Sequence, residues 1–319
     1  MLELRLPAPP LVRARLRALS AARLAVTLCL SGCGAETAIV DVLQKVAVAP
    51  EPTGLAAAPP LPVPLDPTLP VIPEPPEPPE PPEPGACEEG MSLVAGNYCL
   101  TPEHRCLAHQ DIPSERGKII PNQCTRYQEP VICFQNRRQP LRFCMDRYEW
   151  PNQKGELPRN LVSFQDARAA CEATGKRLCT EEEFNFACEG EEMRPYVYGF
   201  ERDASKCNFD RPYRPRSFAF TPFDTCMADP ECRAAYEAID QRQPAGSLDT
   251  CQSDAGIYDL IGNVNEWVLL PRAKSPHRSG LKGGWWGPVR NRCRPTVTFH
   301  DEGDFGYEVG FRCCSDAKP

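Results

Sequence analysis

Cysteine is the residue type that limits the chemistry of this chain most strongly. The sequence has 18 cysteines and 37 prolines among 319 residues, but only four histidines: His104, His109, His277 and His300. No Cys-x-x-Cys occurs, and no two histidines have a zinc-finger or metalloprotease spacing. In a reducing compartment so many thiols would need metal sites, which usually recruit histidine as well. We therefore expect an exported protein, in which the sixteen cysteines between Cys87 and Cys314 form eight disulfides.

A second set of residues that could do chemistry lies near the C-terminal end. Trp285 and Trp286 precede four basic residues, which are Arg290, Arg292, Arg294 and His300. Indole and guanidinium groups together can bind a sugar, a peptide or an anion by stacking and charge, so these residues form a candidate ligand groove. The alternative is core packing of the tryptophans with ion pairs at the surface. His300 stands beside Asp301 and Glu302, but no nucleophile accompanies it.

The charge balance argues against a nucleic-acid partner. The chain has 36 basic and 43 acidic side chains and a net charge of -7. Binding to phosphate needs a basic face, which this composition does not favour.

The first 32 residues are predicted to be a secretory signal peptide. The segment carries five arginines against one glutamate, and a short apolar run at 24–30 follows. This run is too short to span a bilayer as a stable helix. The segment ends in Leu30-Ser31-Gly32-Cys33, which resembles a bacterial lipobox, so we expect Cys33 to carry lipid and to anchor the chain in a membrane. Gly34 favours the outer membrane; the alternative is an ordinary signal peptide with a chance cysteine.

Proline dominates the region that follows an anchor region at 33–49. From Pro50 to Pro84 there are 16 prolines in 35 residues, ending in a repeat of Glu-Pro-Pro. Proline lacks the backbone donor and fixes φ, which excludes a helix or an inner strand. We predict a stiff polyproline-II stalk over 50–86, up to ~100 Å long, that separates a membrane anchor from a folded domain at 87–316.

The elements of that domain are short. Ser163 and Asp166 have capping-box spacing and predict a helix through Thr174. Thr180 and Glu183 predict a second helix that ends near Gly190. Strands are expected within 92–95, 143–148, 264–269 and 307–312. Asp203, Asp210, Asp224 and Asp229 fall in what reads as a loop-like insertion. Helices and strands without βαβ alternation indicate an α+β fold.

Five blocks of this sequence resemble the formylglycine-generating enzyme family, also called sulfatase-modifying factors. They are Met91-Ser-Leu-Val-Ala-Gly, Met145-Asp-Arg-Tyr-Glu, the segment 162–184 with Gly-Lys-Arg-Leu, Gly256-Ile-Tyr-Asp-Leu-Ile-Gly-Asn-Val-Asn-Glu-Trp, and Lys282-Gly-Gly-Trp through Gly310-Phe-Arg. They cover essentially all of 88–316. The resemblance implies an elaborated C-type-lectin-like α+β fold that is low in regular secondary structure.

The chemistry of the family's oxidases is not carried over with the fold. Those enzymes convert a sulfatase cysteine into formylglycine with two cysteines that bind copper(I) shortly after the Lys-Gly-Gly segment, and soft thiolates suit this ion. In this chain the segment 284–292 contains no cysteine, and Cys293 matches a structural cysteine of the family. We therefore expect no copper site and no catalytic residue of the oxidase type.

The resemblance also implies disulfides and calcium. Cys171 would pair with Cys313, and Cys188 with Cys293. One calcium site would use the side chains of Asp259 and Glu266 and the carbonyls of Gly262 and Val264, because hard cations prefer oxygen ligands. The alternative is a tight turn with a solvated glutamate. A second family site would use Asn208, the carbonyl of Phe209 and Asp240.

Three functions remain open from the sequence. The first is a calcium-stabilised binding or interaction module tethered to a membrane, whose ligand is an unidentified protein, glycan or small molecule. The second is a divergent enzyme that modifies an exported protein or a small molecule. The third, which the missing cysteine pair makes weakest, is a true formylglycine-generating oxidase.

Overall fold

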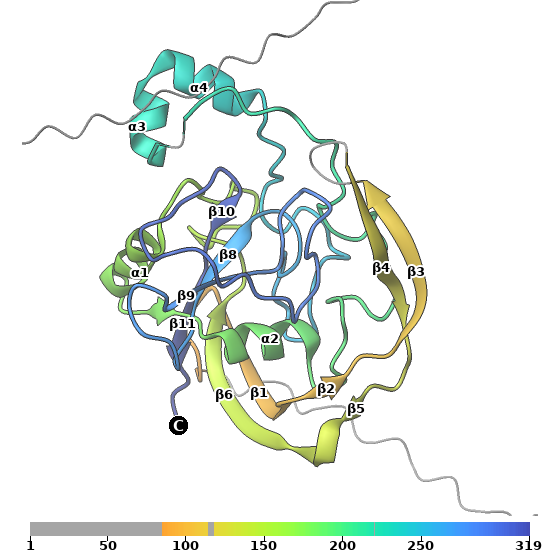
Figure 1. Ribbon diagram of the computed structural model, residues 1–319. Coiled ribbons are helices and arrows are strands. Elements are labelled where there is room, and N and C mark those ends of the chain that lie inside the picture. Colours follow the sequence, from red (N-terminus) through yellow and green to blue (C-terminus); the bar gives the residue numbers. More distant parts are fainter. Residues whose placement is uncertain (1–84, 114–117, 220) are drawn as a thin grey trace, which may run out of the picture. The chain divides into compact units, whose positions relative to one another are not determined.

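The structure is a computed structural model and describes residues 85–113, 118–219 and 221–319 (Figure 1). The predicted signal peptide, Cys33, the anchor region and nearly all of the predicted stalk lie outside these residues. No helix within the described part of the chain is long and apolar enough to cross a membrane.

A four-stranded antiparallel sheet joins the two ends of the described chain. Its order is β1 (Met91–Cys99), β6 (Arg138–Asp146), β11 (Cys313–Asp316) and β7 (Arg177–Leu178). β1 and β6 pair along their whole length. Their inward side chains contribute to the main core. β1 contains the predicted strand at 92–95, and β6 contains the first four residues of the strand predicted at 143–148 but ends at Asp146, whereas β11 was not predicted.

The two predicted helices form as their capping residues indicate. α1 (Phe164–Ala173) begins after Ser163, and α2 (Glu181–Glu189) begins after Thr180. Both capping boxes are complete: the N-cap hydroxyl accepts the N3 backbone N–H, and the N3 carboxylate accepts the N-cap N–H. α2 is buried along most of its length, and its Phe184 is completely enclosed.

A second sheet carries the C-terminal sequence blocks. β8 (Asn265–Leu269) lies between β10 (Val309–Gly310), which is parallel to it, and β9 (Ser279–Lys282), which is antiparallel. This arrangement places the Asn-Glu-Trp block next to the Lys-Gly-Gly block. β10 is much shorter than the strand predicted at 307–312, since only two of those residues pair.

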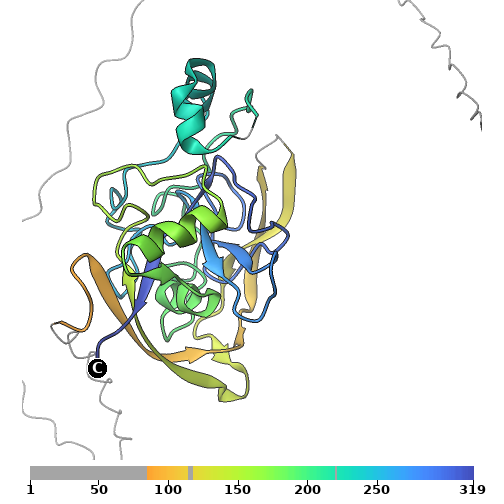
Figure 2. The ribbon, with the colours of Figure 1, turned by 90° about the vertical axis from the view of Figure 1, so that its left-hand side faces the viewer.

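A long hairpin that the sequence did not suggest precedes β6. β3 (Cys106–Pro113) pairs with β4 (Ile119–Tyr127), and the short strands β2 (Pro102–Glu103) and β5 (Ile132–Cys133) pair at its base. A single 3-10 turn, η1 (Phe134–Asn136), follows β5. Figures 1 and 2 show the β3–β4 hairpin standing along one side of the domain.

The stretch expected to be a loop-like insertion contains two helices. α3 (Phe223–Ala228) and α4 (Pro230–Glu237) share Asp229, whose carboxylate accepts the N–H groups of Glu231 and Cys232. Both views show this helical pair beyond the body of the domain (Figures 1 and 2). A disulfide between Cys226 and Cys232 closes it, and Pro230 at the first position of α4 fits the helix start.

All sixteen described cysteines form disulfides. The pairs are Cys87–Cys144, Cys99–Cys133, Cys106–Cys124, Cys171–Cys313, Cys179–Cys314, Cys188–Cys293, Cys207–Cys251 and Cys226–Cys232. Two of them are the pairs that the family resemblance implied. The predicted α+β class is confirmed, with short strands and short helices held by covalent links.

Candidate functional site

Two glycines define the backbone after Lys282. Gly283 and Gly284 have φ values of 80° and 74°, and a Cβ on Gly283 would lie 2.6 Å from the carbonyl oxygen of Leu260. Only glycine fits such a close approach in a left-handed conformation. The tight path turns the following tryptophans into the domain, so the glycines explain where the indoles lie.

The predicted groove of tryptophans and basic residues does not form, because both indoles are core residues. Trp285 and Trp286 are only 4% and 3% exposed and pack with Val264. Their backbone carbonyls are also bound: that of Trp285 accepts the side-chain amide of Asn291, and that of Trp286 accepts the N–H of Arg211. Core packing, the alternative interpretation, therefore holds for both.

The basic residues of the predicted groove point to different places. The Arg290 guanidinium lies 5.7 Å from the Trp285 ring centroid, and Arg292 donates to the Tyr127 hydroxyl. Arg294 binds the buried carboxylate of Glu189, with 2.6 Å between Nε and Oε2. His300 instead lies near Trp267 and Asp304. Although these residues are close in sequence, their side chains do not form one binding surface.

Cys293, the cysteine nearest to the Lys-Gly-Gly segment, is completely buried and bonded to Cys188 of α2. Pro288 lies in the stretch where the family's oxidases have a thiol pair, and it lines a surface cavity. Every cysteine in the described chain is a disulfide. The residues present therefore do not fit a copper(I) site, which needs two thiolates.

The proposed calcium loop contains a buried cluster of carboxylates. Asp259, Glu266 and Glu149 are each at most 4% exposed. Both oxygens of Glu266 accept from the Arg312 guanidinium, at 2.6 and 2.7 Å. The Glu149 carboxylate accepts the Val264 N–H and the Asn263 side-chain amide. The Arg312 guanidinium thus interacts with three acidic groups, and Arg242 adds a second positive charge near Glu149.

Burial and the crowding of acidic groups raise the pKa values of these carboxylates. Burial, and then the nearby Asp259 and Glu266, hold the pKa of Glu149 well above its usual range. Burial raises the pKa of Asp259 from 3.8 to about 6, although the N–H of Gly246 donates to it. Burial also raises the pKa of Glu266, and Arg312 opposes that shift. The donor set at this loop therefore fits a hard cation in chemical type, with Arg312 as a competitor for Glu266.

The second predicted calcium set has arginines where a cation would bind. The Asp240 carboxylate is held by Arg242, at 2.9 Å from Nε and 2.7 Å from a terminal nitrogen. The Asn208 side-chain oxygen accepts from Arg211 at 2.7 Å, and Phe209 is buried below the Arg202 guanidinium. Because arginines hold both side chains, the second set does not fit calcium. Among the residues that the structure describes, no group of three or more His, Cys, Asp or Glu side chains is arranged around a metal position at either set, so the first would rest on two carboxylates and backbone carbonyls.

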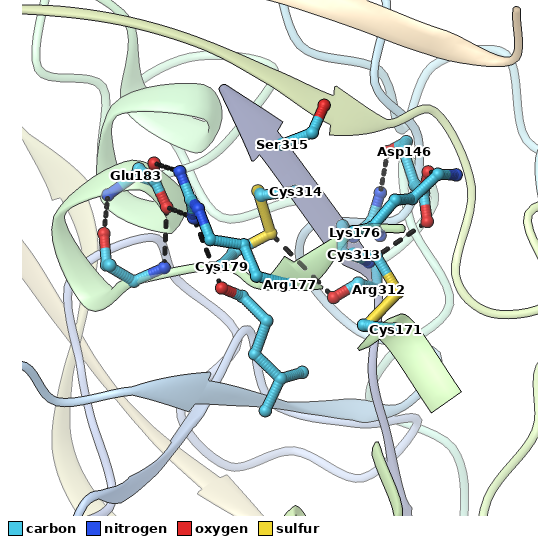
Figure 3. The surroundings of a disulfide bond; sticks show 12 residues. Asp146, Cys171, Lys176, Arg177, Cys179, Glu183, Arg312, Cys313, Cys314 and Ser315 are labelled. Atoms are coloured by element: carbon cyan, nitrogen blue, oxygen red, sulfur yellow. Dashed lines mark hydrogen bonds and ion pairs between the residues drawn. A yellow bond between two sulfur atoms is a disulfide. The ribbon is translucent and has the colours of Figure 1, made fainter. Parts of the chain in front are cut away.

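The family's Gly-Lys-Arg and Gly-Phe-Arg blocks meet between β7 and β11 (Figure 3). Lys176 donates to the buried Asp146 at 2.6 Å. Arg177 binds Glu183 of α2 with two hydrogen bonds, at 2.8 and 2.6 Å. The adjacent cysteines of β11 bond to opposite neighbours, since Cys313 pairs with Cys171 and Cys314 with Cys179 (Figure 3). These blocks are therefore a structural junction.

Two openings lie under the β3–β4 hairpin. A cleft of about 910 Å³ separates Leu107 and the end of β4 from the segment 192–206. A second cavity of about 480 Å³ continues along β3 to Tyr213 and Pro288, and Arg202 lines both. Sequence reasoning missed these openings, because the hairpin has few apolar side chains; the spacing of Cys106 and Cys124 was the only signal for it.

Comparison with known proteins agrees with this architecture. A model of the sulfatase-modifying factor enzyme 1-like domain matches residues 125–317. The "Inactive C-alpha-formylglycine-generating enzyme 2" of Bos taurus is 32% identical over 175 residues, covering 52% of each chain. Its Mus musculus counterpart is 30% identical and covers 52% of this chain and 51% of its own. The chain thus spans about half the length of these curated relatives.

Solved structures are more distant. The crystal structure of CarF covers 72% of this chain and 98% of its own at 15% identity, with a TM-score of 0.43. The structure of PvdO from Pseudomonas aeruginosa gives 16% identity, coverage of 71% and 94%, and a TM-score of 0.38. The family is shown by the match over 125–317, which takes up more than half of the sequence. The chain belongs to the sulfatase-modifying factor, or formylglycine-generating enzyme, family.

Proposed function

We propose that this protein is an exported, membrane-anchored binding module that uses the formylglycine-generating enzyme fold without the oxidase chemistry. The main support for this proposal is that no described cysteine is free: Cys293 is bonded to Cys188, and the other described cysteines are likewise paired. Copper(I) catalysis needs a thiolate pair at the segment after Lys-Gly-Gly. The relatives named inactive formylglycine-generating enzymes support the loss of the oxidase chemistry.

The ligand surface that fits this role best is the cleft between the β3–β4 hairpin and the segment 192–206. Its volume of about 910 Å³ suits part of a macromolecule or a large ligand. Charges of both signs line it, among them Arg126, Glu129, Arg202 and Lys206. Such a surface favours a polar ligand that brings charges of its own.

Calcium has a structural part in this proposal. Asp259 and Glu266 would hold the ion through side-chain oxygens, with the carbonyls of Gly262 and Val264. The added positive charge would compensate the charge of the buried carboxylates Asp259 and Glu266, which share the guanidinium of Arg312. The ion would therefore stabilise the loop 259–264, which leads into β8.

The oxidase alternative is tested with a sulfatase-derived peptide that contains the target cysteine. The purified chain, supplied with copper(I) and oxygen, is expected to leave the peptide unchanged in mass spectrometry. An active member of the family, assayed beside it, provides the positive control. Conversion of the peptide cysteine to an aldehyde by this chain would contradict the proposal.

The binding role is tested by photo-crosslinking in the host envelope. A photoreactive amino acid replaces Leu107, which is 48% exposed inside the cleft, or Leu157, which is 49% exposed and outside it. We expect a defined adduct from position 107 and none from position 157. Equal crosslinking from both positions would argue against the cleft as the ligand surface.

A further inference from the structure

A separate pocket of about 350 Å³ lies between α1, the segment 150–162 and the start of α3. It shares no lining residue with the openings under the β3–β4 hairpin. Its floor is apolar and buried, formed by Leu161, Val162 and Phe311. Half-buried Trp150 and Phe223 add aromatic walls. A concave, apolar and aromatic site of this volume is typical of small-molecule pockets.

The walls are held in place by contacts with the floor of the pocket and with Tyr236 outside it. Trp150 stacks on Phe311 with 5.3 Å between ring centroids, and its backbone N–H donates to the Phe311 carbonyl at 2.8 Å. The N–H of Phe223 donates to the Leu161 carbonyl, and its ring meets Tyr236 edge-on at 6.3 Å. The pocket is therefore preformed and does not depend on a ligand for its shape.

Three charged side chains surround the opening, and two of them are acidic. Arg159 donates to Asp224 at 2.9 Å, which neutralises both. One oxygen of Asp166 accepts from the Ser163 backbone and hydroxyl as part of the helix cap. Asp166 has no basic partner among the described ion pairs, so the opening has a net negative charge. An anionic ligand is disfavoured there.

The pocket already accommodates one cation of the chain itself. The Arg159 guanidinium carbon lies 4.1 Å from the Phe223 ring centroid, so this wall supports a planar cation above an aromatic face. The indole of Trp150 is the better partner for a positive charge, since tryptophan attracts cations more strongly than phenylalanine.

We propose that this pocket binds a small organic ammonium ion whose alkyl groups contact the apolar floor and whose charge lies against Trp150 near the acidic rim. Aromatic walls, an apolar floor and a negative opening are the three features that such a ligand needs together. The proposal goes beyond the binding role assigned to the cleft, and it holds whether or not the chain oxidises cysteine.

Choline and its uncharged carbon isostere, 3,3-dimethylbutan-1-ol, test the proposal on the full chain. The chain contains four tryptophans, so labelling with 5-fluorotryptophan gives one fluorine resonance for each. Trp267, Trp285 and Trp286 are buried in the core. We expect choline to shift the Trp150 resonance, and the isostere to bind about tenfold more weakly. Equal binding of both compounds, or no shift at Trp150, would overturn the proposal.

Variants distinguish this pocket from other sites. Ala170→Leu fills the pocket from α1 with a good helix former and should abolish the choline shift while the other three resonances stay in place. Asp224→Asn leaves Arg159 uncompensated and should weaken choline binding about threefold to fivefold. Asp249→Asn is the matched control, since Asp249 is 86% exposed and Asp224 is 85% exposed. Binding that Ala170→Leu leaves intact would place the ligand elsewhere and refute the assignment.

Discussion

Lys282 carries its amino group into the core of the domain. Its side chain is 1% exposed, and Nζ donates to the Arg294 carbonyl at 2.8 Å and to the Thr296 hydroxyl at 3.1 Å. Burial lowers the pKa of Lys282 from 10.5 to about 7, while the carboxylate of Glu181 opposes the shift. The lysine of the Lys-Gly-Gly block thus anchors the loop 294–296 to β9, and its charge is costly at low pH.

Because the buried charge of Lys282 is costly, Lys282→Met should change how the free energy of unfolding depends on pH. Between pH 7 and about 10 the unfolded chain holds more protons at this site than the folded chain, so the free energy of unfolding rises with pH there. The slope from one such group reaches about 1.4 kcal/mol per pH unit. We expect urea unfolding at pH 7, 8 and 9 to show a smaller rise for Lys282→Met than for wild type. Lys154→Met, at a side chain 57% exposed, is the control and should keep the wild-type slope.

Asp259 provides the matching test for calcium. Its pKa of about 6 exceeds 3.8, so the folded chain holds more protons between these values, and stability without metal falls as the pH rises through this window. The loss at Asp259 is on the order of 3 kcal/mol, and the raised pKa values of Glu149 and Glu266 act in the same direction. Asp259→Asn should flatten the decline, as measured by urea unfolding from pH 4 to 7.

Calcium should reverse that decline in wild type only. Added at pH 7, it is expected to raise the unfolding temperature of wild type and to leave Asp259→Asn unchanged. The stabilisation should fade below pH 6, where Asp259 takes up a proton. If calcium does not raise the unfolding temperature of wild type at pH 7, the proposed site is refuted, regardless of how stability without metal depends on pH.

At the scale of elements, some disulfides stabilise one hairpin, whereas others stabilise the whole domain. Cys106–Cys124 closes 18 residues of the β3–β4 hairpin, whereas Cys171–Cys313 closes 142 residues and joins α1 to β11. Loop-closure entropy gives about 3 kcal/mol for the first and about 5 kcal/mol for the second. We expect the Cys106→Ala/Cys124→Ala variant to raise hydrogen exchange within 106–127 and to leave the body protected. The Cys171→Ala/Cys313→Ala variant should raise exchange throughout; equal, hairpin-limited effects would contradict this division.

The elements that the sequence predicted are those whose signals are local. Ser163 with Asp166, and Thr180 with Glu183, satisfy backbone donors within four residues, so the helix starts could be found without the fold. The hairpin was missed because most side chains of β3 and β4 are exposed or half-buried, which removes the alternation that marks a strand. α3 and α4 were missed because six and eight residues are too few for a helical period to stand out.

The candidate sites were less accessible to sequence reasoning than the fold. Tryptophans beside arginines suggested a groove, but the path of Gly283 and Gly284 buries both indoles. Glu266 could be named as an acid, yet its partner Arg312 lies 46 residues away. Pairing across such distances is fixed by tertiary packing, which spacing in the sequence does not encode.

At the scale of the whole molecule, the thiol content is a direct test of the architecture. The described part holds sixteen cysteines in eight disulfides, and the remaining two are Cys29 and Cys33. If Cys29 is removed with the signal and Cys33 carries lipid, the mature protein has no free thiol. Thiol titration in guanidinium without reductant should therefore find none, and two reactive cysteines in the mature chain would contradict the assignment.

Membrane anchoring through Cys33 is tested separately. Cys33→Ser should prevent lipid attachment and move the protein from the membrane to the soluble fraction of the envelope. Palmitate labelling and fractionation measure both effects, and Cys29→Ser is the matched control because it lies within the predicted signal. Membrane retention of Cys33→Ser would argue against the lipid anchor.

The position of Cys87–Cys144 has a mechanical consequence. Near the N-terminal end of the described residues, Cys87 is bonded to Cys144 of β6, the strand between β1 and β11. The opposite end closes on the same place, since the N–H of Lys318 donates to the carbonyl of Ala86 at 2.9 Å. A pulling force applied from the N-terminal side would therefore pass through a covalent bond into the middle of the sheet, and β1 would be shielded from peeling. Reduction of this one disulfide should turn a mechanically resistant attachment into one that unzips strand by strand.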